Sequence, residues 1–127
     1  MEGTVETRAQ IAYLHADGIF RVRAKAGTDL TLVEAREIIK KMGSLSGGQP
    51  RPALVDATGT KSIDREARRY FAGHETAKVE SAAALIIRSP LSRAIGNFFM
   101  GLNKAQIPVR LFTSEDEALE WLRGFRT

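Results

Sequence analysis

The sequence predicts an α/β domain with a mixed, mainly parallel sheet of about five strands and four helices. Two observations lead to this prediction. Apolar and basic residues alternate near the start of the chain, as they do in a β-hairpin with one buried face. Short apolar runs then alternate with segments of helical periodicity, which implies parallel strands joined by right-handed crossovers. The expected order is β-β-α-β-α-β-α-β-α, in one domain that spans all 127 residues.

The opening hairpin is predicted over residues 9–25. Its second strand, IFRVRAK, places apolar side chains on one face and basic side chains on the other. The preceding segment, AQIAYLHA, is apolar enough to be its partner. Between them, Asp17 and Gly18 predict a two-residue turn. Residues 1–8 are largely polar, and we expect them to form a flexible N-terminal segment.

The remaining elements follow from periodicity and from the residues at their ends. Thr31 and Glu34 have the spacing of a capping box, and Ser114 with Glu117 repeats that spacing near the C-terminus. The glycine-rich stretch GSLSGGQP predicts a loop. We expect helices over residues 29–45, 62–78, 90–104 and 114–125, and strands over residues 52–57, 81–89 and 109–113.

The composition is that of a soluble globular protein, with 43% hydrophobic and 27% charged residues. The net charge is +4, but the basic residues are scattered among acidic ones and do not alternate with aromatic residues, so we expect no nucleic-acid site. The absence of cysteine excludes disulfides and thiol nucleophiles. No apolar run approaches the roughly 18 residues of a membrane span, and the first residues lack the pattern of a secretion signal. We therefore expect a cytoplasmic protein without membrane insertion.

The segment VDATGT, residues 55–60, looks like the loop in which P-type ATPases phosphorylate an aspartate. Such an enzyme also needs acidic residues to hold Mg²⁺ and a lysine to neutralise the phosphoryl oxygens. Ala57 stands where the P-type loop has its lysine, and no acidic pair follows a later strand. We therefore expect Asp56 to end a strand and to accept hydrogen bonds from loop amides, rather than to act as a nucleophile.

Other enzyme chemistry has no better basis in the sequence. His15 and His74 are the only histidines, and they are isolated from each other and from a nucleophile. No phosphate-binding glycine motif opens a helix, and no set of residues has metal-ligand spacing. The sequence therefore predicts a protein that is not an enzyme and that carries no cofactor and no metal.

The segment ALVDATGTKSIDREARRYF, together with FTSEDEALEWL, resembles the STAS family of SpoIIAA-like domains, which includes anti-sigma-factor antagonists. It is also similar to a bacterial STAS/SEC14-type group of poorly defined function. The resemblance implies the SpoIIAA-like fold, with Asp56 as the strand-end aspartate and Asp64 as the second aspartate of the motif. It also implies that a hydroxyl residue after the second aspartate is phosphorylated by a partner kinase. Arg65 stands at that position, so the usual phosphoacceptor is missing, and we expect nearby Ser62 to be a capping or turn residue.

Two classes of function agree with these observations. The first is a non-enzymatic regulatory or interaction domain that binds a protein partner, or a second copy of itself as a homodimer. Its surface would lie around residues 57–65 and the start of the next helix, where Arg65, Arg68 and Arg69 favour an acidic partner. The candidate residues of this surface are Asp56, Thr58, Ser62, Asp64 and Arg65.

The second class is a carrier or sensor that holds a lipophilic or anionic small molecule between the sheet and the helices. The resemblance to SEC14-type proteins implies the lipophilic ligand. The carboxyl end of a central strand is where open α/β sheets bind ligands, and free amides at a helix start suit an anion. Ser89, Arg93 and Asn97 occupy that position and are the candidate residues. An apolar stripe that includes Ile95 and Phe98 follows on the same predicted helix.

Overall fold

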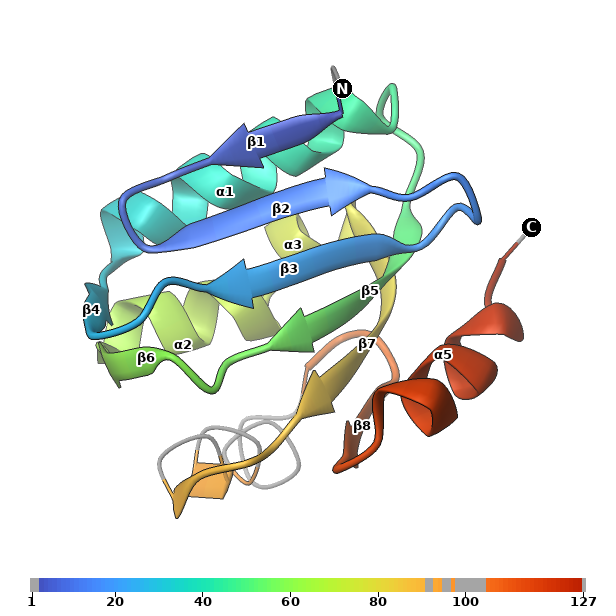
Figure 1. Ribbon diagram of the computed structural model, residues 1–127. Helices are drawn as coiled ribbons and strands as arrows, with labels where there is room; N and C mark the ends of the chain where they lie inside the picture. Colours follow the sequence, from blue (N-terminus) through green and yellow to red (C-terminus); the bar gives the residue numbers. More distant parts are fainter. Residues whose placement is uncertain (1–2, 91–92, 95–96, 98–104, 127) are drawn as a thin grey trace.

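The computed structural model describes residues 3–90, 93–94, 97 and 105–126. Figure 1 shows a sheet with helices on both of its faces. The strands are β1 (Thr4–Glu6), β2 (Gln10–Leu14), β3 (Phe20–Ala24), β4 (Thr28–Leu30), β5 (Arg51–Asp56), β6 (Thr60–Ile63), β7 (Glu80–Ile86) and β8 (Val109–Phe112). The helices are α1 (Leu32–Leu45), α2 (Arg65–Ala72), α3 (His74–Ala77) and α5 (Glu115–Arg123).

The main sheet has six strands in the order β1-β2-β3-β5-β7-β8. The pairs β1–β2 and β2–β3 are antiparallel, and the pairs β3–β5, β5–β7 and β7–β8 are parallel. The prediction of a mixed, mainly parallel sheet is therefore confirmed. The expected number of about five strands was too low, because β1 extends the sheet and because β4 and β6 form a separate two-stranded parallel sheet.

The first strand corrects the prediction of a flexible segment over residues 1–8. Val5 lies opposite Ala12 in an antiparallel pair, and its side chain packs against the core on the α1 side. The Glu6 carboxylate forms an ion pair with the Lys25 ammonium. A three-residue strand is too short to give a period-two pattern, so its apolar residue did not stand out in the sequence.

The hairpin is confirmed, but its turn is longer than two residues. Leu14 lies opposite Phe20, and the His15 amide donates to the Ile19 carbonyl at 3.2 Å. Asp17 closes the loop: its carboxylate accepts the Ile19 amide at 2.9 Å and the Arg21 guanidinium at 2.7 Å. The Ile19 amide donates to the Asp17 side chain and not to a backbone carbonyl, and the chain turns over residues 15–19.

The predicted helix over 62–78 is two helices preceded by a strand. Thr60–Ile63 is β6, and Asp64 then caps α2 by accepting the Ala67 amide at 2.8 Å. The chain leaves helical geometry at Gly73 and starts again as α3, where the Thr76 hydroxyl donates to the Tyr70 carbonyl at 2.8 Å. His74 is exposed at the start of α3.

Helices α1 and α5 begin directly after the predicted N-caps, Thr31 and Ser114. The predicted range 29–45 began too early, because Asp29 and Leu30 belong to β4. At α1, the Thr31 amide donates to the Glu34 carboxylate at 3.0 Å, and the buried stripe contains Ala35, Ile39 and Met42. At α5, the Glu117 amide donates to the Ser114 hydroxyl at 3.3 Å. The predicted helix over 90–104 falls mostly outside the described residues; the described ones, Pro90, Arg93, Ala94 and Asn97, have helical backbone.

Two layers of side chains form the core. Helices α1, α2 and α3 cover one face of the sheet, and α5 covers β5, β7 and β8 on the other face (Figure 1). On the α1 side, Phe20, Ile38 and Met42 are fully buried. On the α5 side, Ala84 and Leu122 belong to a cluster that Trp121 and Phe125 complete.

Candidate functional site

Asp56 ends β5 and organises the loop that follows it. One carboxylate oxygen accepts the Thr58 amide at 3.0 Å, and the other accepts the Arg88 guanidinium at 2.7 Å. Burial alone would raise the pKa of Asp56, but hydrogen bonds from Thr58 and the charge of Arg88 hold that pKa below its ordinary value. The prediction that Asp56 accepts a loop amide is confirmed. Arg88 was missed; its signal was its position, directly after the long apolar run of β7.

Gly59 fixes the same loop against the β3–β4 connection. Its carbonyl accepts the Gly27 amide at 2.8 Å. A Cβ at position 59 would lie 2.9 Å from the Ala24 carbonyl oxygen and 3.1 Å from the Ala26 Cα. Only glycine fits this approach of two backbones, so the glycine of VDATGT has a packing role.

Ser62 lies in β6, not at a helix cap, which corrects the expectation for this residue. Its hydroxyl donates to the carboxylate of Asp29 on β4. The Asp64 amide donates to the Leu30 carbonyl at 3.0 Å, so the two short strands are joined at both ends of β6. The side chain that caps α2 is that of Asp64.

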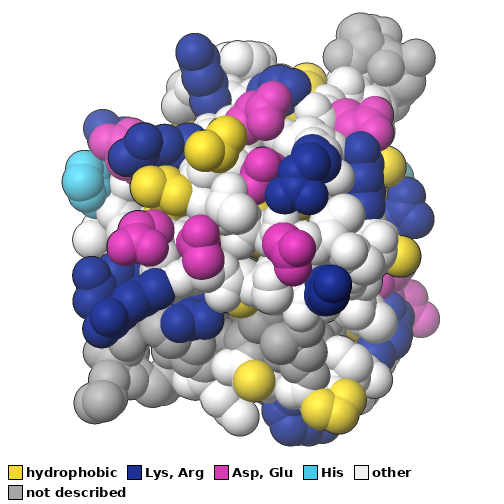
Figure 2. Space-filling view, turned by 90° about the vertical axis from the view of Figure 1, so that its left-hand side faces the viewer, with side chains coloured by type: hydrophobic (Ala, Val, Ile, Leu, Met, Phe, Trp, Pro, Cys, Tyr) yellow, Lys and Arg dark blue, Asp and Glu magenta, His cyan; other side chains and the backbone are white. Residues whose placement is uncertain are grey.

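We call the exposed residues of the segment 57–66 the loop–β6–α2 surface: Thr58, Lys61, Ser62, Asp64, Arg65 and Glu66. Thr58, Lys61 and Arg65 are exposed on it. Figure 2 shows the side of the molecule that carries β4 and β6, where basic and acidic side chains are interspersed. The surface that the sequence predicts to be basic also exposes the acidic residues Asp64 and Glu66.

The second predicted group lies beyond the end of β7. Ser89 is half-buried, and its carbonyl accepts the Arg93 amide at 3.0 Å. The side chains of Arg93 and Asn97 are exposed. Arg88 is the residue that links this end of β7 to the loop–β6–α2 surface, through its ion pair with Asp56.

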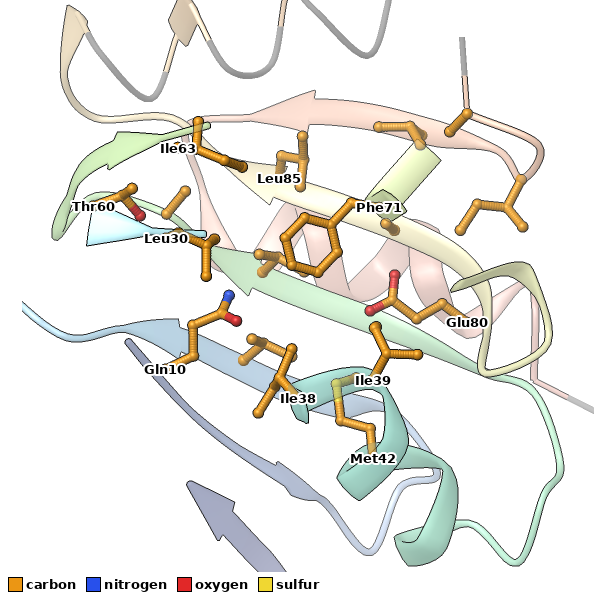
Figure 3. A pocket seen from close by; sticks show the side chains of 17 residues that line it. Gln10, Leu30, Ile38, Ile39, Met42, Thr60, Ile63, Phe71, Glu80 and Leu85 are labelled. Carbon is orange, nitrogen blue, oxygen red and sulfur yellow. The ribbon is translucent and has the colours of Figure 1, made fainter. Parts of the chain in front are cut away.

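A partly open cavity of about 70 Å³ lies between the sheet and the helices on the α1 side (Figure 3). None of the predicted site residues lines it. Its wall is mostly apolar and is formed by residues of strands β2 to β8, of helices α1 and α2, and of the segments after β5 and before β8. The lining residues are Gln10, Val22, Leu30, Ile38, Ile39, Met42, Val55, Ala57, Thr60, Ile63, Phe71, Glu80, Ala83, Leu85, Ala105, Ile107 and Val109.

Three buried polar residues line this cavity: Gln10, Thr60 and Glu80. Figure 3 shows the Gln10 amide and the Glu80 carboxyl pointing inward from different ends, with the Phe71 ring between them. Gln10 is 6% exposed and Glu80 is 7% exposed. Among the described residues the Gln10 Oε1 atom has no hydrogen-bond partner, and burial raises the pKa of Glu80 to about 8. The sequence indicated no role for Gln10 or Glu80. Each is the first residue of a strand, and the alternation of apolar and polar residues does not show that its side chain is buried.

Over residues 3–90, 93–94, 97 and 105–126, no three histidine, aspartate or glutamate side chains come together in a way that could hold a metal ion. Within the same described part of the chain, no helix is both long enough and apolar enough to cross a bilayer.

The fold is that of solved SpoIIAA-like proteins. An anti-sigma factor antagonist from Mycobacterium paratuberculosis is 19% identical, with a TM-score of 0.63 over 94% of this chain and 99% of that chain. Phosphorylated SpoIIAA, a Bacillus cell fate determinant, is 15% identical, with a TM-score of 0.58 over 89% and 98%. An uncharacterised DUF3478 protein from Shewanella loihica PV-4, which has a SpoIIAA-like fold, is 19% identical, with a TM-score of 0.56 over 94% and 90%.

These likenesses define the class: an α/β domain with the SpoIIAA-like fold that the STAS resemblance implied. No curated protein matches the sequence. The model of one family, the domain of unknown function DUF7793, matches residues 13–126. The chain belongs to this DUF7793 family.

Proposed function

We propose that this chain is a non-enzymatic regulatory domain of the bacterial cytoplasm that binds a partner protein through its loop–β6–α2 surface. The observation that carries the proposal is the way this surface is fixed. Asp56 and Asp64 accept backbone amides, and the Ser62 hydroxyl donates to the Asp29 carboxylate, while Thr58 and Arg65 are exposed to solvent. A surface that is ordered before binding loses little conformational entropy when a partner docks. The fold shared with an anti-sigma factor antagonist supports the same role.

Binding on this surface is proposed to be independent of phosphorylation. The Bacillus relative was solved in a phosphorylated form, but Arg65 stands here where the family resemblance places the phosphoacceptor. A phosphate on Ser62 would face the carboxylate of Asp29, to which the Ser62 hydroxyl is bound, and two like charges repel. The fixed positive charges of Lys61 and Arg65 favour a partner that presents a carboxylate to them.

The proposal is tested by reversing one exposed charge on the surface. A photo-crosslinking amino acid at position 61 captures the partner in cells, and the purified pair is then titrated by calorimetry. We expect Arg65→Glu to weaken binding by about tenfold or more, because a favourable charge contact becomes a repulsive one. Arg36→Glu is the matched control, an equally exposed reversal on α1 that should leave binding within about twofold. Equal binding by all three proteins would exclude this surface.

A second copy of the chain is one candidate for the partner. Sedimentation velocity over a range of protein concentrations distinguishes this case, since a homodimer appears with the pure protein alone. In that case Arg65→Glu should shift the monomer–dimer equilibrium towards monomer. A chain that stays monomeric at all concentrations leaves a different protein as the partner.

A second candidate function, a small-molecule carrier or sensor, is favoured by the cavity between the sheet and the helices. Native mass spectrometry of protein taken directly from cell lysate tests it. A carrier should show added mass that disappears when the protein is denatured. An unchanged mass would favour the interaction domain.

A further inference from the structure

The cavity contains polar groups that the fold itself does not use. Glu80 starts β7, and no hydrogen bond or ion pair engages its carboxyl group among the described residues. Gln10 lies at the start of β2, and its Oε1 atom is buried without a partner. Buried polar atoms are normally paired, because an unpaired one loses its hydrogen bonds to water without replacement. Two such side chains that point into one cavity indicate a ligand that supplies the missing donors.

None of the described cations forms an ion pair with Glu80. Arg51 lies opposite Glu80 in the β5–β7 register, but its guanidinium lies beside Gly18 in the hairpin turn, with its Nε atom buried and unpaired. Glu75 on α3 and Lys78, the residue after α3, form an exposed ion pair with each other at 3.6 Å. On α1, Lys40 is exposed to solvent. Among the described residues, burial is the only cause of the shift in the pKa of Glu80, so none of their cations neutralises its carboxylate.

We propose that the cavity binds a small aliphatic amine, with the ammonium group against the Glu80 carboxylate and the apolar body among the side chains of α1, α2 and β7. This inference deepens the carrier alternative and is independent of partner binding on the loop–β6–α2 surface. The cavity measures about 70 Å³, whereas one water molecule needs roughly 10–15 Å³. Its size therefore suits a short or branched chain. An anionic ligand is disfavoured, since the described lining contains no lysine or arginine and the unpaired Gln10 Oε1 atom is an acceptor.

The choice of an amine over an alcohol has a measurable consequence. At neutral pH the isolated carboxyl group is mostly protonated, because burial raises the pKa of Glu80 to about 8. An ammonium ion requires the carboxylate, so its binding displaces that proton into solvent. The affinity should therefore increase by about tenfold per pH unit up to the pKa of Glu80. A neutral alcohol requires no ionisation, and its affinity should not rise.

Three probes with one isopropyl body test the proposal: isobutylamine, isobutanol and isobutyrate. Each is titrated into the full chain while NMR follows the methyl groups of Ala83 and Leu85, which line the cavity. We expect isobutylamine to shift these methyl signals, with tighter binding at pH 8 than at pH 6, and isobutyrate to leave them unchanged. Glu80→Gln should weaken isobutylamine binding by about tenfold or more and abolish its pH dependence, while isobutanol binding stays within about twofold.

A second variant locates the site independently of Glu80. Ala83→Leu fills the cavity and should remove binding of every probe; Ala83→Val is the smaller step if the leucine variant does not fold. Isobutylamine binding that survives in a folded cavity-filled variant would overturn the location. Equal binding of isobutylamine and isobutyrate, or an amine affinity unchanged by Glu80→Gln, would overturn the ligand class but keep the cavity as a site. Failure of all three probes would reject the cavity site and leave the partner-binding proposal untouched.

Discussion

At the scale of single residues, Asp56 and Gly59 fix the conformation of the segment VDATGT in two different ways. Asp56 uses its carboxylate to join the loop amide of Thr58 to the guanidinium of Arg88. Gly59 uses the absence of a side chain, which lets its backbone approach Ala24 and Ala26. The Asp56 carboxylate and the missing side chain of Gly59 therefore determine the shape of the loop. Both residues have structural roles, and Asp56 need not be a nucleophile to explain its position.

Replacement of Gly59 by alanine should destabilise the protein by about 1–3 kcal/mol, because the new methyl group meets backbone atoms that cannot move aside easily. Urea denaturation measures the change. Gly124→Ala is the matched control: its φ is −68°, and the nearest atom to an added Cβ, the Trp121 carbonyl oxygen, lies at 3.4 Å. The control should be close to neutral. Equal effects at the two positions would contradict the packing role of Gly59.

At the scale of elements, the helix starts carry specific signals, whereas the short strands do not. Asp64 caps α2 and Ser114 caps α5, each through one side-chain oxygen that accepts a backbone amide three residues later. The first turn of α5 also carries three acidic residues, which the partial positive charge at a helix start stabilises. In α2, by contrast, Glu66 is the only acidic residue of the first turn, so Asp64 contributes a larger share of the stabilisation there.

Asp64→Ala should therefore cost about 1 kcal/mol of folding free energy, and Asp64→Asn should cost less because asparagine also caps helices. Thermal unfolding followed by circular dichroism gives both values. Ser114→Ala provides the comparison at α5. If Asp64→Ala is as stable as the original protein, then contacts of the helix body, and not its cap, fix the start of α2.

Helices and strands could be predicted where apolar periodicity or a capping residue marks them in the sequence. The hairpin, α1 and α5 have clear periodicity or caps, and the structure confirms them. The two-stranded β4–β6 sheet was missed because its strands are only three and four residues long and are paired across the intervening helix. Such pairing depends on tertiary contacts, to which a local pattern is insensitive.

The same limit applies to the candidate sites. The bond from Asp56 to a loop amide follows from local turn chemistry and was predicted. Its ion pair with Arg88 joins the ends of two neighbouring strands, and the sequence does not say which strands are neighbours. The cavity could not be predicted either. Its polar residues Gln10 and Glu80 are the first residues of β2 and β7, and only the folded sheet brings these two strands to one cavity.

At the scale of the whole molecule, three carboxyl groups shift the dependence of stability on pH in opposite directions. For Asp17, burial is outweighed by the Arg21 guanidinium and the Ile19 amide, and the pKa falls to about 2. The Thr31 hydroxyl, with the Thr31 amide and Arg8, lowers the pKa of Glu34 to about 2 against the effect of burial. For Glu80, burial acts alone and raises the pKa to about 8.

The signs lead to one testable profile. The two lowered groups stabilise the fold above their ordinary pKa values of 3.8 and 4.5, and that contribution is lost as the pH falls towards 2. The raised pKa of Glu80 contributes to stability below its ordinary value of 4.5, and this contribution is lost as the pH rises to about 8. We therefore expect the free energy of unfolding, measured by urea denaturation, to be highest near about pH 5.

Two variants distinguish the loss of stability at acid pH from the loss between about pH 5 and 8. Glu80→Gln should flatten the decrease between pH 5 and 8 and leave the acid limb unchanged, because an amide does not titrate. Glu34→Gln should flatten part of the acid limb only. A decrease above pH 5 that persists in Glu80→Gln would assign it to another group.

The six-stranded sheet ends in two short strands, and this affects how copies of the protein can meet. An unpaired strand edge is a template on which another chain can add a strand, and long apolar edges lead to fibrous aggregates. Here the edge strands are β1, with three residues, and β8, with four. Each carries a charge, Glu6 on the first and the exposed Arg110 on the second. Short edge strands that carry charges discourage strand addition from one molecule to the next at both ends of the six-stranded sheet.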